Sequence, residues 1–225
     1  AARGRSGMMV LREAIRQGAT TGIAAVDTPD ELPAFLQPDC PALIWRRHPS
    51  PCFQKWIDAF EPERLPRARV ILRPKNVAEA ISLIFENCNT PDCPQSAMLV
   101  EDTTLQAQVF ADLMRTPFLR LRYDVVSTNA CRKFHIDVVT ARLICTYRGS
   151  GTQYGFPESG DADPAHIYSV ATGSSILLRG KLWPESPDTG LRHRSPPIEG
   201  TGQTRLVLVL DPIVDPDAHS EPKFL

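Results

Sequence analysis

The chain has 225 residues, 42% of them hydrophobic and 23% charged, and a formal net charge of −1 at pH 7. These values are typical of a soluble globular protein that can bury a substantial core. The near-neutral charge gives no electrostatic reason to expect nucleic acid or an anionic membrane as a partner. Because no apolar run approaches the roughly 20 residues of a membrane span or the length of a signal-peptide core, we expect a cytoplasmic protein.

The first half of the chain predicts short helices and two strands. Residues 99–116 are the longest helix candidate, and an apolar stripe through Leu105, Val109, Leu113 and Met114 is expected to face the core. The other expected helices are 28–37, 50–60 and 76–88, and the expected strands are 42–47 and 67–74.

From residue 117 onward the pattern changes to short, alternating runs rich in β-branched residues and separated by Gly, Pro, Ser and Asp. Such runs are typical of an antiparallel sandwich or barrel, and we expect a mainly β protein built on a double-stranded β-helix, or jelly roll. Residues 1–116 would form a mixed, helical support region and residues 117–225 the jelly-roll core, together one compact unit. The expected strands of the core are 118–126, 133–139, 141–147, 165–171, 174–180, 191–195 and 204–211.

The six cysteines are scattered, and only Cys88 and Cys93 lie close together at a spacing that would suit zinc. Since no second pair stands at zinc-ribbon spacing, we interpret the cysteines as reduced thiols. Cys131 and Cys145 are expected to be buried and to pack with apolar residues.

A histidine and an aspartate two residues apart, His135 and Asp137, occur in an expected strand. The simplest interpretation is a surface histidine beside a turn aspartate. Side chains two apart on a strand share a face, however, so an imidazole and a carboxylate can converge on one metal ion. His193, at the end of a later expected strand, is the favoured third ligand, and His166 is the alternative. Two histidines and one carboxylate form the facial triad of non-haem Fe(II) oxygenases.

The order of motifs over roughly residues 119–211 resembles the Fe(II)/2-oxoglutarate dioxygenase superfamily, especially its prolyl-hydroxylase-like branch. The chain departs from that branch in its turn, which reads Gly-Thr-Gln-Tyr where the hydroxylases have a doubled glycine and an acid. More narrowly, the sequences "CRKFHID", "RLICTYRGSGT" and "HRSPP" are similar to an uncharacterised bacterial family of unknown function. The matching elements are His135-Ile136-Asp137, Arg142 with "LICTY", Gly151-Thr152, "GSSILL" from Gly173, His193 and Arg205.

The resemblance implies an Fe(II) ion held by the triad and 2-oxoglutarate as co-substrate, although another divalent metal could occupy the same ligands. Arg205 is expected to bind the distal carboxylate of 2-oxoglutarate, unless it forms an ordinary ion pair at the strand end. Tyr147 or Thr146 would add a hydroxyl contact, since alternation allows only one of them to point inward; core packing is the other interpretation of Tyr147. Arg142 could be a charged residue of the pocket, but an exposed strand arginine is the favoured interpretation.

Three functions therefore compete. The favoured one is an oxygenase acting on a small molecule or on an amino-acid or protein side chain. The second is a cupin-like metal-binding protein, either a sensor or store or an enzyme without 2-oxoglutarate. The third is a structural or interaction domain in which the triad is accidental.

Overall fold

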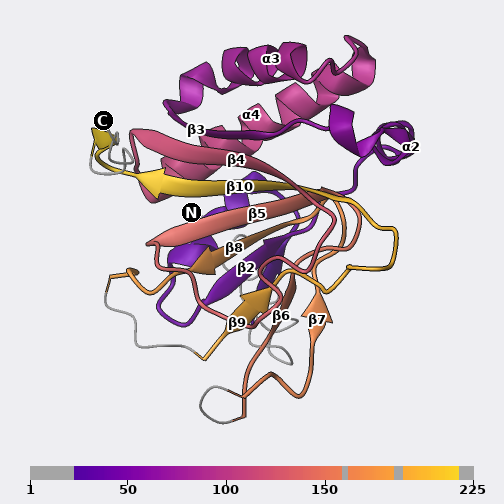
Figure 1. Ribbon diagram of the computed structural model, residues 1–225. Helices are drawn as coiled ribbons and strands as arrows, with labels where there is room; N and C mark the ends of the chain where they lie inside the picture. Colours follow the sequence, from indigo (N-terminus) through magenta and orange to yellow (C-terminus); the bar gives the residue numbers. More distant parts are fainter. Residues whose placement is uncertain (1–22, 159–161, 185–189, 218–225) are drawn as a thin grey trace, which may run out of the picture.

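The computed structural model describes residues 23–158, 162–184 and 190–217, and its main feature is a seven-stranded sheet. The strand order in this sheet is β1-β2-β8-β5-β10-β4-β3, and a second sheet has the order β7-β6-β9 (Figure 1). The strands are β1 (Ala24–Val26), β2 (Ala42–Trp45), β3 (Ala68–Leu72), β4 (Phe118–Val126), β5 (Ala141–Arg148), β6 (Gln153–Gly155), β7 (Tyr168–Ser169), β8 (Ser175–Arg179), β9 (Arg192–Arg194) and β10 (Arg205–Ile213).

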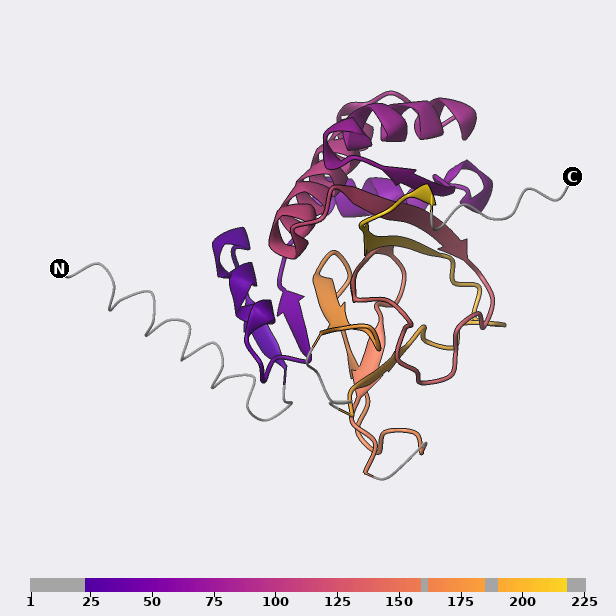
Figure 2. The same ribbon diagram turned by 90° about the vertical axis from the view of Figure 1, so that its left-hand side faces the viewer.

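The helices lie on one side of the seven-stranded sheet and the three-stranded sheet on the other, as Figures 1 and 2 show. The α-helices are α2 (Pro51–Ala59), α3 (Val77–Asn87) and α4 (Pro94–Met114), and the 3-10 helices are η1 (Pro29–Leu36), η2 (Pro62–Arg64) and η3 (Pro74–Asn76). The two antiparallel sheets facing each other are those of the expected jelly roll. The expected strands 42–47 and 67–74 form β2 and β3 of the large sheet, so the first 116 residues supply strands as well as helices.

Strand β10 divides the interior into two cores because its successive side chains alternate between the faces of the sheet. Leu206, Leu208 and Leu210 pack on the helical side. Val207 and Val209 pack on the other side, toward the small sheet. All pairings of the large sheet are antiparallel except that of β1 with β2, which is parallel.

Helix α4 buries a different face from the expected one. It begins at Pro94 and packs through Leu99, Ala107 and Phe110, together with the polar side chains of Thr103 and Gln106. Leu105 is 47% exposed, so the predicted stripe is wrong at this position. The buried polar residues of α4 hydrogen-bond to residues of the sheet, which is why the amphipathic pattern does not mark the inner face.

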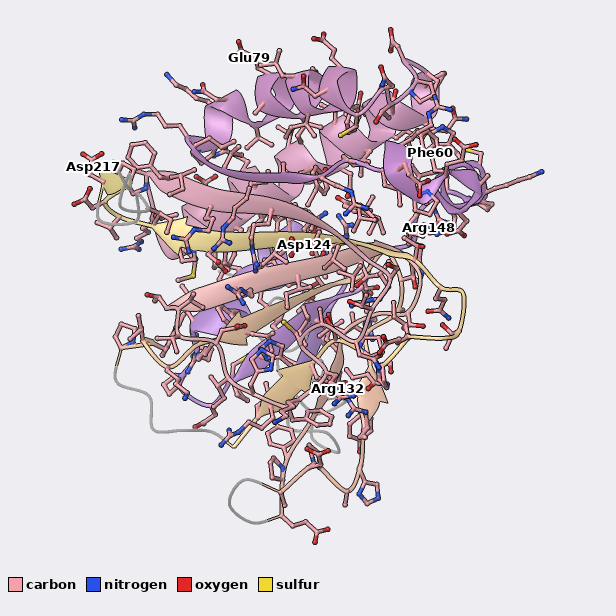
Figure 3. The ribbon with its side chains drawn as sticks, viewed as in Figure 1. Phe60, Glu79, Asp124, Arg132, Arg148 and Asp217 are labelled. Carbon is pink, nitrogen blue, oxygen red and sulfur yellow. The ribbon has the colours of Figure 1, made fainter. Side chains whose placement is uncertain are left out.

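Helix α2 is fixed at both ends. Ser50 caps its first turn by accepting a hydrogen bond from the Phe53 amide at 3.3 Å. At the other end, Arg148 of β5 donates to the Phe60 carbonyl at 2.6 Å, and the two residues lie close together in Figure 3. These contacts tie the helix to the sheet.

All six cysteines are free. Cys145 is buried as expected, but Cys131 is exposed, so its prediction as a packed core thiol is wrong. Cys131 has a φ of 55°, at a turn ahead of the segment that carries His135. Within the described residues, no helix is both long and apolar enough to cross a membrane.

Candidate metal centre

His135 and His193 are held side by side by their backbones. Each donates its amide hydrogen to the carbonyl of the other, at 3.0 and 3.1 Å, in an isolated antiparallel bridge. His193 belongs to β9, so this bridge adds the segment around His135 to the edge of the small sheet. Residues paired in this way project their side chains to the same face, and the two imidazole rings lie 4.6 Å apart.

Asp137 does not lie on a strand, so the predicted strand over residues 133–139 is reduced to the bridge at His135. The loop that follows His135 is fixed instead by the turn after β8. The amides of Gly180, Lys181 and Leu182 donate to the carbonyls of Thr140, Asp137 and Val139.

The two segments approach so closely that position 180 has no room for a side chain. A Cβ at Gly180 would lie 1.9 Å from the carbonyl oxygen of Val139 and 2.9 Å from that of Asp137. The glycine is therefore required by the close approach that positions the Asp137 loop.

The three side chains converge on one point. One ligand atom of each of His135, Asp137 and His193 lies within 4.8 Å of the others. Nε2 of His193 is 3.0 Å from Oδ2 of Asp137, and Nε2 of His135 is 3.6 Å from Oδ1. The Nδ1 atom of His135 lies 2.8 Å from the Lys133 carbonyl, which can only accept; this orients the ring so that Nε2 faces the aspartate.

Arg142 forms an ion pair with the carboxylate of Asp137 and is itself paired with Asp211. Its Nη1 contacts Oδ1 of Asp137, and its Nε and Nη2 donate to the two oxygens of Asp211 at 2.6 and 2.8 Å. The side chain of Arg142 is only 14% exposed and that of Asp211 only 2%, so the prediction of an exposed strand arginine is wrong. Alternation along β5 and β10 could have placed both side chains on the inner face, but their pairing depends on strand register.

Burial and the charges within this cluster favour an ionised Asp137 beside a neutral His193. Burial alone would raise the pKa of Asp137, but the close approach of the His135 and His193 rings and the charge of Arg142 outweigh it and hold that pKa far below its usual value. Burial lowers the pKa of His193, which favours its neutral form. For His135 the interaction with the Asp137 carboxylate, 3.6 Å away, dominates and raises the pKa of the imidazole.

These residues fit a divalent metal ion. Oδ2 of Asp137 is buried and forms no hydrogen bond within the described part of the chain, although Nε2 of His193 lies 3.0 Å away. A cation held between these two atoms would satisfy that acceptor. Two imidazole nitrogens and one carboxylate oxygen are donors suited to first-row divalent metals such as iron.

The triad opens into a cavity of about 620 Å³ between the two sheets. Arg205, the first residue of β10, lies in its wall and is 1% exposed. Its Nε donates to the Ser150 carbonyl at 2.6 Å, Nη1 to Oγ of Ser195 at 3.0 Å and Nη2 to Oγ1 of Thr146 at 3.3 Å. Burial lowers the pKa of Arg205 to about 10, so it stays cationic at neutral pH, and no carboxylate among the described residues pairs with it.

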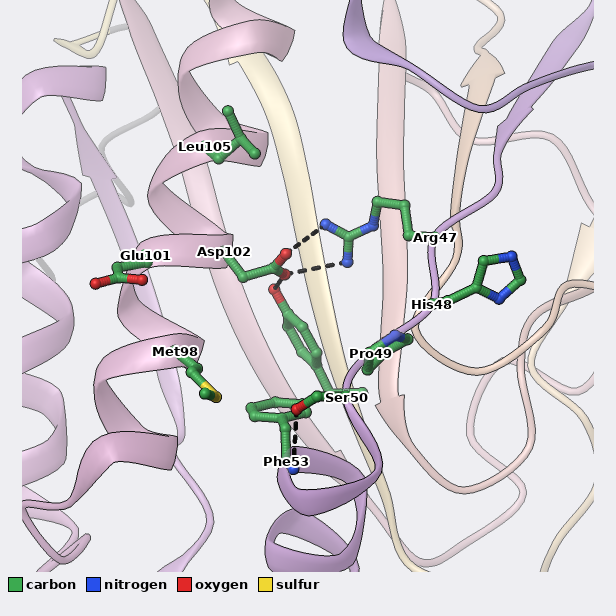
Figure 4. Close-up of a pocket in the computed structure, with 10 residues that line it drawn as sticks. Arg47, His48, Pro49, Ser50, Phe53, Met98, Glu101, Asp102 and Leu105 are labelled. Carbon is green, nitrogen blue, oxygen red and sulfur yellow. Dashed lines mark hydrogen bonds and ion pairs between the residues drawn. The ribbon is translucent and has the colours of Figure 1, made fainter.

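Tyr147 does not reach this cavity, which corrects its predicted role in co-substrate binding. Its hydroxyl donates to Oδ2 of Asp102 at 2.5 Å and also contacts Thr103 and Gln106 of α4, on the opposite face of β5. Asp102 in turn pairs with Arg47 in a separate pocket, shown in Figure 4. Thr146, the other residue considered, points inward and contacts Arg205.

The other histidines that the structure describes lie away from the triad. His48 and His166 are exposed, so the alternative third ligand is not near the site. His219 lies outside the described residues. Arg194 and Ser195 line the cavity beside His193. Trp183 packs against Phe35 at the far edge of the core, with ring centroids 5.2 Å apart.

Comparison with solved structures connects this architecture to known oxygenases. The chain is similar to dioxygenase for auxin oxidation 1 of Arabidopsis thaliana in its binary complex with 2-oxoglutarate, with 10% identity and a TM-score of 0.54 over 87% of this chain and 94% of that one. It is also similar to the rice dioxygenase for auxin oxidation, with 14% identity and a TM-score of 0.49 over 87% and 84% of the two chains. At this identity the first likeness shows a shared fold, and it confirms the expected jelly roll.

Sequence comparison gives the family. A search of curated proteins found no match. A family model described as "Protein of unknown function (DUF1826)" matches residues 26–211. Since this match covers most of the 225 residues, the chain belongs to that family, DUF1826.

Proposed function

We propose that this protein is a non-haem oxygenase that uses Fe(II) and 2-oxoglutarate. The observation that carries the proposal is that one cavity contains both the converged His135, Asp137 and His193 and the buried cation of Arg205. A metal site alone would fit many proteins. A buried arginine that has no carboxylate partner in the described part of the chain fits a site that also takes a dicarboxylate.

His135, Asp137 and His193 would hold the metal through three ligands and leave positions free for co-substrate and oxygen. With these bound, an iron ion supplies the chemistry that couples decarboxylation of 2-oxoglutarate to oxidation of a substrate C–H bond. The role of the protein is to orient the ligands, bind the co-substrate and limit the access of water.

After its contacts with the protein, the Arg205 guanidinium keeps two N–H groups that can donate to a carboxylate. A guanidinium has five N–H groups, and three contacts of Arg205 use one on each nitrogen. The two that remain lie on Nη1 and Nη2, which is the arrangement for an end-on bidentate pair. Isolated burial of such a cation costs several kcal/mol, and a charge-assisted contact with the distal carboxylate would offset much of that cost.

The second candidate is a cupin-like metal-binding protein without 2-oxoglutarate. It is favoured by the same hydrogen bonds of Arg205, because three neutral oxygens already satisfy part of the guanidinium. In either case we propose a cytoplasmic protein whose substrate is a small molecule or an amino-acid or protein side chain.

Anaerobic titration of the Fe(II)-loaded protein with 2-oxoglutarate tests the proposal, since chelation of iron by the keto acid produces a visible charge-transfer band. We expect a saturable band in the wild type. Arg205→Gln should weaken 2-oxoglutarate binding by roughly ten- to a hundredfold, corresponding to about 1.5–3 kcal/mol for a charged hydrogen-bonded contact. Metal affinity should be unchanged, because Arg205 is not a ligand.

Tyr147→Phe is the matched control, because it removes a buried hydroxyl from β5, the strand next to β10, on the face of the sheet away from the cavity. It should leave the titration unchanged. A wild-type protein that binds iron but gives no band with 2-oxoglutarate would favour the cupin-like alternative.

A further inference from the structure

The cavity beside the triad carries more positive charge than the metal and co-substrate need. Its lining includes five arginines and two aspartates, an excess of three positive charges. Asp211 compensates one more charge through its pair with Arg142. A divalent cation and the two carboxylates of 2-oxoglutarate cancel each other, so an excess of about two positive charges remains. The charged lining residues are Arg67, Arg122, Arg142, Arg194, Arg205, Asp124 and Asp137.

Most of these arginines have partners. Arg142 is held by Asp137 and Asp211. Arg194 donates to the Gln153 side chain at 2.8 Å and lies over the Phe134 ring. Arg67 donates to the Val125 carbonyl at 3.2 Å from an exposed position. Arg205 is the proposed co-substrate anchor.

Arg122 is the exception among the lining arginines. Its side chain is 21% exposed, and its one ion pair with the described residues is with Asp124, at 3.6 Å. Its Nε is buried and has no hydrogen-bond partner within the described residues. Four buried side-chain atoms share that condition, and two of them, Arg122 Nε and Asp137 Oδ2, belong to residues of this one cavity. A native protein rarely leaves a buried guanidinium donor unpaired unless a ligand completes it.

Strand register separates Arg122 from the co-substrate anchor. Arg205 pairs with Val126 across β10 and β4, and Arg122 is four residues farther along β4 on the same face. Four residues of a strand span about 13 Å, so the two guanidinium groups serve different parts of the cavity. Val207 and Val209 of β10 line the wall between them.

Arg122 is nevertheless within reach of the triad. It pairs with Val209, which pairs with Ile144 of β5, so the three residues form one row across the sheet. Two strand spacings amount to about 10 Å, the length of a small organic molecule. Arg142, two residues before Ile144 on the same face, holds Asp137.

We propose that Arg122 forms a second oxyanion site, which binds a carboxylate or phosphate group of the substrate while an apolar part of the substrate lies against Ile144, Val207 and Val209. The substrate class is then an organic anion whose reacting carbon lies between its charged group and the metal. Only this assignment to the substrate rests on the proposed function; the anion site itself is a property of the cavity.

Calorimetric titration with phenyl phosphate and with phenylacetate tests the site and distinguishes the two oxyanions. Each probe combines one oxyanion with an aromatic ring for the apolar wall. The full chain is titrated with and without saturating Mn(II) and 2-oxoglutarate. We expect one equivalent of at least one probe to bind in both conditions, and Arg122→Gln to weaken that binding at least tenfold. Arg122→Lys, which keeps the charge, should retain part of the affinity.

Arg69→Gln is the matched control. Arg69 is the direct neighbour of Arg122 across the β3–β4 pair, but it is exposed and does not line the cavity. It should change probe affinity less than twofold. Equal affinity in wild type and Arg122→Gln, equal losses in Arg122→Gln and Arg69→Gln, or no binding of either probe would overturn the proposal.

Measuring 2-oxoglutarate affinity in the same variants separates this proposal from the proposed function. Arg122→Gln should not change it, whereas Arg205→Gln should weaken 2-oxoglutarate and spare the probes. A loss of 2-oxoglutarate binding in Arg122→Gln as large as the loss of probe binding would place Arg122 in the co-substrate site and overturn the second site. Probe binding that depends on Arg122 in a protein that never binds 2-oxoglutarate would support the anion site and contradict the oxygenase.

Discussion

Replacing Asp211 by asparagine should weaken metal binding although Asp211 is not a ligand. Its carboxylate makes two hydrogen bonds of 2.6 and 2.8 Å with Arg142, which contacts Oδ1 of Asp137. The substitution keeps the shape of the side chain but removes its charge. Arg142 then loses its only other anionic partner among the described residues and no longer holds Asp137 in a fixed orientation.

The expected magnitudes follow from burial. The side chain of Asp211 is 2% exposed and that of Arg142 14%, so solvent screens this pair weakly. Breaking a buried pair from one side typically costs about 3–5 kcal/mol; because asparagine can still accept one hydrogen bond, we expect the lower end, near 3 kcal/mol of unfolding free energy. Loss of an outer partner of a ligand typically lowers metal affinity about ten- to a hundredfold.

Two measurements check this prediction: urea unfolding of the metal-free protein, and competition for Zn(II) or Mn(II) with a chromophoric chelator. Asp124→Asn is the control, since Asp124 lies on the neighbouring strand β4 and lines the cavity, but its side chain is 43% exposed and 3.6 Å from Arg122. It should change stability by no more than about 0.5 kcal/mol. If Asp211→Asn lost stability but bound metal as tightly as the wild type, the positioning role of Arg142 would be refuted.

Three further predictions concern the supports of the site. Gly180→Ala should lower metal affinity and stability together, because its Cβ would lie 1.9 Å from a carbonyl oxygen of the loop that carries Asp137; chelator competition and urea unfolding measure both effects. Tyr147→Phe should cost about 1–3 kcal/mol in urea unfolding, because it removes the 2.5 Å hydrogen bond between the buried Tyr147 hydroxyl and the partly exposed Asp102, without changing 2-oxoglutarate affinity. Burial raises the pKa of Cys40 from 9.0 to about 11. The neutral thiol therefore stabilises the fold fully below pH 9, and this contribution is lost as the pH rises to about 11. In Cys40→Ala, the free energy of unfolding should fall by about 2–3 kcal/mol less between pH 9 and pH 11 than in the wild type, as measured by urea unfolding.

The sequence predicts the ligands better than it predicts what surrounds them. His135, Asp137 and His193 can be chosen because the imidazole and carboxylate donors and their order along the chain suit one metal ion. The conformation that joins them is not that of the expected strand. A backbone bridge joins the histidines, and the loop of Asp137 is shaped by its approach to Gly180, a contact between distant segments.

The alternation of side chains along β5 could not decide whether Thr146 or Tyr147 faces the cavity. The sequence indicates that they face opposite sides of β5, but both sides of this strand are buried, so polarity does not show which side meets the metal. The answer depends on α4, whose Thr103 and Gln106 receive the tyrosine hydroxyl. The pair of Arg142 and Asp211 was missed for a similar reason, since 69 residues separate its members.

Metal content tests the central claim most directly. Wild-type protein, dialysed anaerobically against Fe(II) and then freed of unbound metal, should retain one equivalent of iron by elemental analysis. His193→Ala should retain almost none while keeping its fold by circular dichroism. His166→Ala, which removes an exposed histidine away from the triad, should retain one equivalent. Full iron occupancy in a folded His193→Ala protein, or none in the wild type, would contradict the metal centre on which the proposed function depends.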